Sequence, residues 1–327
     1  MEDRVRRRQG AHYTSERDIM KVIRSLFLDE LRAGWERVKV DRSTRRRASL
    51  EAFHQRLRSL QFLDPACGCG TFLVLAYREL RTLEIDVVRE LAAGSGGQQL
   101  LPIVNVDQFH GIEYSEWPVR IAEVALWLMD HQMNAEAGEV FGQPIDRLPL
   151  TSAPHIVHGN ALHVDWNTVL PRDQCSYVMG NPPFVGHQWR NVEQQEDMAR
   201  IWGENGRFDY VTCWFRRGAE YIAGTTIPVA FVATNSISQG EQVGILWGDL
   251  FSRGVGIDFA HRTFNWASEA RGAAQVDVVI IGFSLRHPAI RRLHDYDGDE
   301  KQIEATVSEC ANISPYLVVG PNLAFPH

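Results

Sequence analysis

A short apolar strand, a glycine loop and a helix follow one another between residues 60 and 74, and this stretch constrains the fold more than any other. The run Leu-Gln-Phe-Leu ends at Asp64, and Gly68 and Gly70 lie in the loop before a helix that we expect to reach about Leu83. Glycines permit close approach of the backbone to a ligand, and an acid at a strand end can accept hydrogen bonds from one. This order predicts the first unit of a doubly wound α/β sheet.

Polar side chains end two of the strands that follow. We expect further buried strands, separated by helices, at residues 109–113, 156–162, 177–180, 228–234, 256–259 and 276–283. Glu113 stands at the end of its strand, where an acid in a Rossmann-like fold binds ribose hydroxyls. It lies 49 residues after Asp64, and the polar insertion 92–99 accounts for the unusual length of this connection. Asn160 can offer its amide to a purine edge.

The helical segments suggest how the chain is divided. Residues 16–31 have helical apolar spacing behind Thr14 or Ser15 as N-cap, and residues 41–60 read as a basic amphipathic helix. Residues 117–133 form a strongly apolar helix that we expect to be largely buried. We therefore expect an N-terminal helical segment (1–60), a catalytic domain (61–290) and a C-terminal extension (291–327) that contributes an edge strand or leaves the domain.

The stretch Asn181-Pro182-Pro183-Phe184 directly follows a predicted strand. Two prolines fix φ near −65° and remove two backbone donors, so the chain leaves the sheet as a stiff loop. An amide side chain and free carbonyls in such a loop can accept hydrogen bonds from a planar amino group, and Phe184 offers a face for its ring. The alternative is an ordinary turn at a strand end, since Asn and Pro are common loop residues.

Composition limits where such a protein works. No run of eighteen apolar residues occurs, and the Arg-rich start has no apolar core, so we predict neither a membrane span nor a signal peptide. Five cysteines, odd in number and without paired CxxC spacing, indicate a reduced, cytoplasmic protein. Cys67 and Cys69 have no further cysteines or histidines nearby, so we expect packing roles for them and no metal site.

Charge is distributed unevenly. Residues 1–60 carry a net charge of +7 and the remainder carries −14. The arginine runs at 4–8 and 42–47 could meet phosphates, although solvated helix faces are the commoner explanation of such runs. The basic clusters alone therefore do not predict nucleic-acid binding.

The motifs in this order resemble the S-adenosylmethionine-dependent DNA amino-methyltransferases, and with Gly10–Thr14 before them they are similar to the γ-type N6-adenine enzymes. Longer runs resemble the MmeI-type (type IIL) restriction-modification enzymes, over residues 8–325: 109–134, 233–242 and 261–266. The resemblance implies a class I methyltransferase fold with a mostly parallel, seven-stranded sheet and helices on both faces. It also implies methylation of adenine N6 in double-stranded DNA, with S-adenosyl-L-methionine as cofactor.

The resemblance also implies roles for individual residues. The methionine end of the cofactor would be held by Tyr13, Thr14, Asp64, Ala66 and Gly68. Its ribose would be bound by Glu113, and its adenine would lie against Tyr114, with Asn160 at the adenine edge and Ala161 beside it. In the catalytic loop, Asn181 and the Pro182 carbonyl would accept hydrogen bonds from the target amino group, with Pro183 stiffening the turn. Phe184 would stack on the flipped base and Phe264 would form the second apolar wall.

Members of this subgroup are much longer, with a nuclease domain before the region and a recognition domain after it. We find no convincing PD-(D/E)xK pattern and expect no cleavage. The chain is thus expected to be a truncated piece, a solitary remnant, or a subunit that relies on a separate specificity domain or subunit. Two other functions stay open: a cofactor-binding module inactive by itself, and methylation of a protein glutamine or an RNA base.

Overall fold

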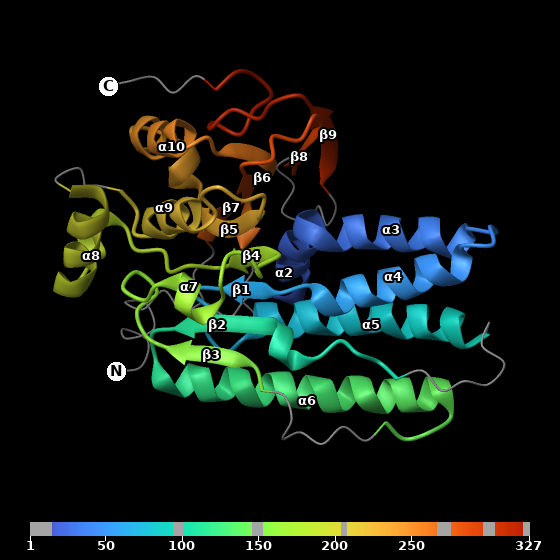
Figure 1. Ribbon diagram of the computed structural model, residues 1–327. Helices are drawn as coiled ribbons and strands as arrows, with labels where there is room; N and C mark the ends of the chain where they lie inside the picture. The colour runs from blue at the N-terminus through green and yellow to red at the C-terminus, as the bar shows by residue number, and fades with distance from the viewer. Residues whose placement is uncertain are drawn as a thin grey trace.

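The computed structural model describes residues 15–93, 101–145, 153–203, 208–266, 276–296 and 305–322. These residues form a nine-stranded sheet in the order β3-β2-β1-β4-β5-β7-β6-β8-β9 (Figure 1). The strands are β1 (Phe62–Asp64), β2 (Phe109–Glu113), β3 (His155–His158), β4 (Tyr177–Gly180), β5 (Val229–Thr234), β6 (Gly256–Trp266), β7 (Val276–Ser284), β8 (Arg291–Asp295) and β9 (Thr306–Cys310). The α/β class is confirmed.

The expected number of seven strands was wrong. Strands β1 to β5 pair in parallel, whereas β7 runs antiparallel between β5 and β6. Because β7 lies between β5 and β6, the other edge of β6 is open. Strand β8 pairs with that edge of β6 in parallel, and β9 then pairs with β8 in antiparallel. Both added strands come from the predicted C-terminal extension. They pair with an open strand edge, whose free backbone N–H and C=O groups readily bond another strand.

Helices cover both faces of this sheet. They are α2 (Glu16–Ile23), α3 (Asp29–Val40), α4 (Arg46–Ser59), α5 (Thr71–Ala93), α6 (Glu116–Phe141), α7 (Trp166–Val169), α8 (Val192–Trp202), α9 (Thr212–Tyr221) and α10 (Gln242–Ser252). Alternation along β5 shows the two layers: Ala230 and Val232 join the core beneath α2 to α6, while Phe231 joins the core of α7 to α10. Side chains on a strand point alternately to opposite faces, so each face has its own core.

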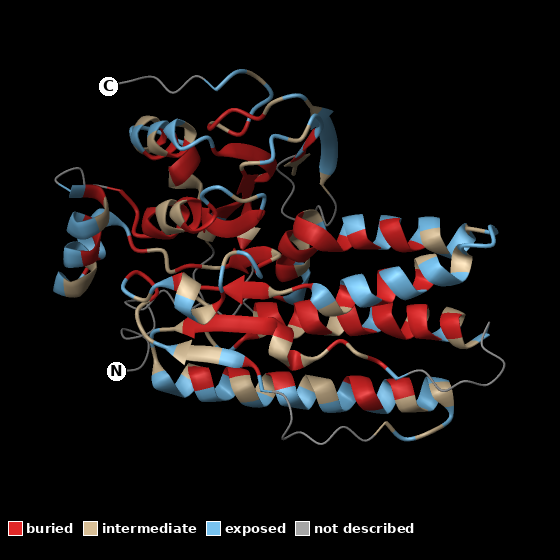
Figure 2. Cartoon of the chain, viewed as in Figure 1, coloured by how far each residue is buried: buried red, intermediate tan, exposed pale blue. Residues whose placement is uncertain are grey.

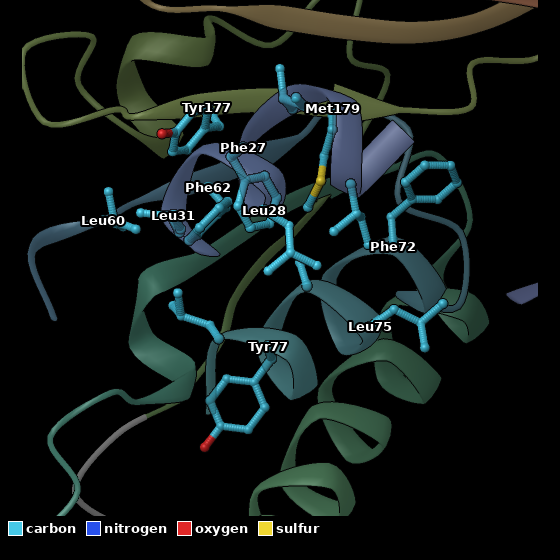
Figure 3. Close-up of a cluster of buried hydrophobic side chains, with 14 of the residues drawn as sticks. Phe27, Leu28, Leu31, Leu60, Phe62, Phe72, Leu75, Tyr77, Tyr177 and Met179 are labelled. Carbon is cyan, nitrogen blue, oxygen red and sulfur yellow. The ribbon is translucent and has the colours of Figure 1, made fainter. Parts of the chain in front are cut away.

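An aromatic cluster joins the N-terminal helices to the centre of the sheet (Figure 3). The Phe62 ring on β1 lies 4.9 Å from Phe109 and 5.0 Å from Phe27, whose ring is 5.1 Å from Tyr177 on β4. Phe27 belongs to a π-helical segment, η1 (Arg24–Leu28), that interrupts the helix expected over 16–31. The N-cap at Ser15 is confirmed, since its side chain accepts a hydrogen bond from the Asp18 backbone N–H.

A buried polar network joins α5 to α6, which lie side by side (Figure 1). Helix α5 runs to Ala93, beyond the expected end near Leu83. The fully buried Arg81 bonds Asn134 at 3.0 Å and pairs with Glu84 at 3.3 Å and Asp130 at 3.4 Å. Carboxylates on both sides of the guanidinium compensate its desolvation, because a buried charge is tolerated when it is paired and hydrogen-bonded.

The expectation that 117–133 would be largely buried was wrong. Val119, Ala122 and Leu126 face the core, but Trp117 is 80% exposed and Leu128 is 58% exposed. Helix α6 lies at the outside of the helical layer, and buried and exposed residues alternate along it (Figure 2). Its exposed side also carries large apolar residues, so a second apolar stripe faces outward. Within the described ranges, no helix combines the length and apolar character needed to cross a bilayer.

Replacing Phe62 tests the importance of the aromatic cluster. Phe62→Ala removes a fully buried ring that contacts Phe27 and Phe109, and we expect a loss of about 3–5 kcal/mol in the free energy of unfolding. Trp117→Ala removes an exposed ring from α6, and we expect a change within about 0.5 kcal/mol. Urea denaturation measures both, and equal losses would show that β1 is not the centre of the core.

Candidate active site

Four polar residues singled out in the sequence follow four neighbouring parallel strands. Asp64 ends β1, Glu113 ends β2, Asn160 follows β3 and Asn181 follows β4. The strands are adjacent in the order β3-β2-β1-β4, so the four residues lie along one edge of the sheet. Ligands of open α/β sheets bind at the carboxyl ends of their strands. Tyr13 and Thr14 lie outside the described residues.

Asp64 lies directly against the end of β4. It is fully buried, and its Oδ1 accepts a hydrogen bond from the Ala66 backbone N–H at 3.0 Å. A Cβ added to Gly180 would lie 2.6 Å from the same Oδ1, so only glycine lets the two strand ends come this close. Burial raises the pKa of Asp64 to about 8; the Ala66 N–H opposes this rise and the Glu113 charge adds to it. Oδ2 is buried without a hydrogen-bond partner among the described residues.

Glu113 holds the glycine loop in place. Its Oε2 accepts from the Gly68 N–H at 3.0 Å and its Oε1 accepts from the Ser115 N–H at 2.9 Å. Gly68 has φ +55°, a conformation that side chains disfavour. Burial raises the pKa of Glu113, and the two N–H groups partly offset that rise. Each carboxylate oxygen has a second lone pair, so the residue can still accept from hydroxyl groups.

Helix α8 contacts the residues expected at the cofactor's adenine. The half-exposed Tyr114 donates its hydroxyl proton to Glu193 at 2.8 Å. Asn160 donates its amide to Asp197 at 3.1 Å, and its Oδ1 accepts from the Leu162 N–H at 2.9 Å. The next residue in the chain, Ala161, is buried. The amide of Asn160 is therefore fixed in orientation.

The Asn-Pro-Pro-Phe loop leaves the sheet where Asp64 and Gly180 meet. Pro182 is buried, Pro183 and Phe184 are half-buried, and Phe184 packs against the cores on both faces of the sheet. The Asn181 side-chain oxygen is also buried. The loop thus places an amide, a carbonyl and an aromatic ring beside the strand-end acid.

Phe264 lies at the same sheet edge but is mostly covered. It pairs with Val278 on β7, which in turn pairs with Thr234 at the end of β5. Its exposed fraction is 8%, and the Lys21 ammonium lies 4.1 Å from the ring centroid. Lys21 also pairs with Asp18 at 2.6 Å. The Lys21 ammonium covers one face of the Phe264 ring, so Phe264 could line a pocket only with its other face or its edge.

Sequence reasoning missed four residues of this region: Gly180, Glu193, Asp197 and Asp209. The last three are acids in polar or amphipathic stretches, where a charge normally faces solvent. Asp197 and Asp209 are both buried. Their burial is tolerated because distant groups donate hydrogen bonds to them: the Asn160 amide to Asp197 and the Val185 N–H to Asp209. A usable signal was the position of Asp209 just before helix α9, because acids are favoured at the start of a helix.

Comparison with known proteins gives a consistent picture. Residues 40–295 match a family model described as MmeI, DNA-methyltransferase domain. The chain is 40% identical over 320 residues to DNA methyltransferase A of Bacillus subtilis (strain 168), covering 96% of this chain. It is similar to the type IIL restriction-modification enzyme MmeI, whose structure was solved in complex with DNA, with TM-score 0.90, 48% identity and 97% of this chain covered. A nuclease-deletion mutant of the type ISP enzyme LlaGI shares the fold at TM-score 0.50, 15% identity and 88% coverage of this chain.

These relatives are longer than the region that matches. The chain spans 35% of DNA methyltransferase A, 42% of the MmeI chain and 24% of the LlaGI mutant.

Adding one methyl group tests the contact between the two strand ends. Gly180→Ala places a Cβ against Asp64, which cannot move away without losing its bond to Ala66, and we expect about 1–3 kcal/mol of destabilisation. Gly248→Ala on α10 meets no heavy atom within 4 Å and should be neutral or stabilising. Urea unfolding compares the two, and an unaffected Gly180→Ala protein would contradict the close approach.

Proposed function

The chain belongs to the MmeI DNA-methyltransferase family, and from this we propose that it transfers a methyl group from S-adenosyl-L-methionine to the N6 amino group of adenine in double-stranded DNA. In this role it would serve as the modification part of a restriction-modification system. The observation that carries the proposal is the contact of Asp64 with Gly180, because it sets an acid-and-glycine loop beside the Asn-Pro-Pro-Phe loop.

The residues at the sheet edge fit the cofactor. Asp64 has a buried oxygen with no partner among the described residues, which suits an ammonium group. Backbone groups of Ala66 and Gly68 would line the methionine end, and Glu113 has lone pairs for the ribose hydroxyls. Tyr114, Asn160 and Ala161 would contact the adenine. When bound, the cofactor supplies an electrophilic methyl group on a sulfonium.

The Asn-Pro-Pro-Phe loop would act on the target amino group. The lone pair of an aryl amine is delocalised into its ring, which makes the nitrogen a poor nucleophile. Hydrogen bonds donated by its two N–H groups to the Asn181 Oδ1 and the Pro182 carbonyl would favour a tetrahedral nitrogen whose lone pair points at the methyl group. Positioning of this kind supplies roughly 7–11 kcal/mol of barrier lowering in well-oriented reactions. The adenine must leave the duplex to reach the loop, and Phe184 would stack on it.

Selection of a DNA sequence would need more than the described residues. Residues after 60 carry a net charge of −14, and phosphate contacts supply most non-specific DNA affinity. A basic recognition domain or subunit would therefore have to supply base contacts and much of the affinity.

Methyl transfer depends on Asn181 in this proposal. We expect Asn181→Ala to bind S-adenosyl-L-methionine normally by calorimetry but to transfer labelled methyl groups to mixed-sequence DNA at least about a hundredfold more slowly, since one preorganised polar contact is worth that much. Mass spectrometry of the digested DNA should identify N6-methyladenine. Asn322→Ala, an exposed asparagine near the C-terminus, is the matched control.

The outcomes separate the candidate functions. Binding without transfer by the wild type would assign a cofactor-binding module that needs its recognition part. Labelled protein or RNA in place of DNA would reassign the substrate. Absence of cofactor binding would refute the proposal.

Cofactor affinity should rise with pH. A folded-state pKa of about 8 keeps Asp64 mostly protonated below that value, and a cationic ligand group favours the ionised form, so binding releases a proton. We expect affinity to increase up to about tenfold between pH 6 and pH 7. Asp64→Asn should bind more weakly, with affinity nearly constant over this range. Calorimetry in buffers of different ionisation enthalpy detects the released proton, and a pH-independent wild type would contradict the assignment.

A further inference from the structure

The run of residues 233–242 makes no hydrogen bond described above to the groups assigned to the cofactor or the target base. It comprises the end of β5, a 3₁₀ turn, η5 (Asn235–Ser238), and the start of α10. Two side chains of this run, those of Thr234 and Gln242, bond the same residue, Asp209. Thr234 donates its hydroxyl proton to Asp209 Oδ2 at 3.0 Å, and Gln242 Oε1 accepts from the Asp209 backbone N–H at 3.0 Å.

Asp209 in turn holds the exit of the catalytic loop. Its Oδ1 accepts from the backbone N–H of Val185, the residue after Phe184, at 3.1 Å and from that of Val211 at 3.3 Å. The Tyr210 backbone N–H donates to the Val185 carbonyl at 3.1 Å. Both backbone groups of Val185 are therefore bound by one short segment.

Burying the Asp209 carboxylate at the end of the catalytic loop costs free energy. Asp209 is buried, which raises its pKa, while hydrogen bonds from Val211, Thr234 and Val185 and the nearby Arg190 charge oppose the rise. A buried acid with three donors around it is a rigid point, because losing any donor leaves a buried acceptor unsatisfied. Two prolines stiffen the loop from its start at β4, and Asp209 fixes its other end.

We propose that Asp209 is a positioning residue that, held by Thr234 and Gln242, fixes Phe184 and the carbonyl and amide acceptors of the catalytic loop. The inference rests on the proposed function for its catalytic meaning. The clamp itself is a property of the fold, so it can be measured without turnover.

Hydrogen exchange measures the clamp directly in the full chain. Asp209→Ala removes the acceptor of the Val185 N–H, and we expect exchange of that amide to accelerate at least about tenfold, with amides of β2 unchanged. Cofactor affinity should stay within about twofold, while methyl transfer should fall by at least about tenfold, since misplacement of reacting groups by about 1 Å costs this much or more. Loss of binding and transfer in equal measure would mean general destabilisation and would overturn the proposal.

Conservative variants keep the test sharp. Asp209→Asn retains an oxygen for both backbone N–H groups, and we expect exchange and transfer within about threefold of the wild type. Thr234→Val is isosteric and removes one donor, so it should give an intermediate acceleration of Val185 exchange even if Asp209→Ala fails to fold. Asp249→Ala on α10, where Asp249 pairs with Arg253, is the matched control and should change neither readout.

Two results would refute the clamp: unchanged Val185 exchange in Thr234→Val, or an Asp209→Asn protein as defective as Asp209→Ala. If the wild type bound cofactor but transferred no methyl group, the exchange rates would still decide the clamp. The two proposals can therefore fail separately.

Discussion

The contact between Asp64 and Gly180 is the constraint on which the rest of the site depends. It brings the carboxyl ends of β1 and β4 close enough that the glycine loop and the proline loop share one edge of the sheet. Phe62, two residues before Asp64, ties the same strand to the aromatic cluster and so to the N-terminal helices. Core packing on one face thus fixes the spacing of polar groups at the edge.

Three acids at this edge, the buried Asp64 and Asp209 and the half-buried Glu113, differ in how completely they are satisfied. Asp209 accepts three hydrogen bonds, Glu113 accepts two from backbone N–H groups, and Asp64 accepts one and keeps a second oxygen without a described partner. An acid with several donors holds backbone in place, whereas a desolvated acid with few donors favours its protonated form until a further donor arrives. The three acids therefore divide between fixing the two loops and receiving a ligand.

Local patterns in the sequence were enough for the strands at the centre of the sheet. An apolar run that ends in a polar residue marked β1, β2 and β4, because buried parallel strands are apolar along their length. β8 and β9 lacked that signal, since β9 is an exposed edge strand held mainly by backbone pairing. Helix α6 carries two apolar stripes, and its sequence cannot tell which one faces the core. The sequence did not predict that Asp197 and Asp209 are buried, because their burial depends on hydrogen-bond partners far along the chain.

The π-helical segment η1 sets the phase between two parts of one continuous helix. Upstream of it, Lys21 reaches Phe264; within it, Ser25 bonds His261 at 2.9 Å and Phe27 packs on the sheet. Removing one residue would restore regular α-helix and turn everything upstream by about 100° around the axis. Lys21 would then face away from β6. We therefore expect evolution to constrain the length of this segment more than most of its side chains, so that substitutions accumulate there while single-residue deletions are lost.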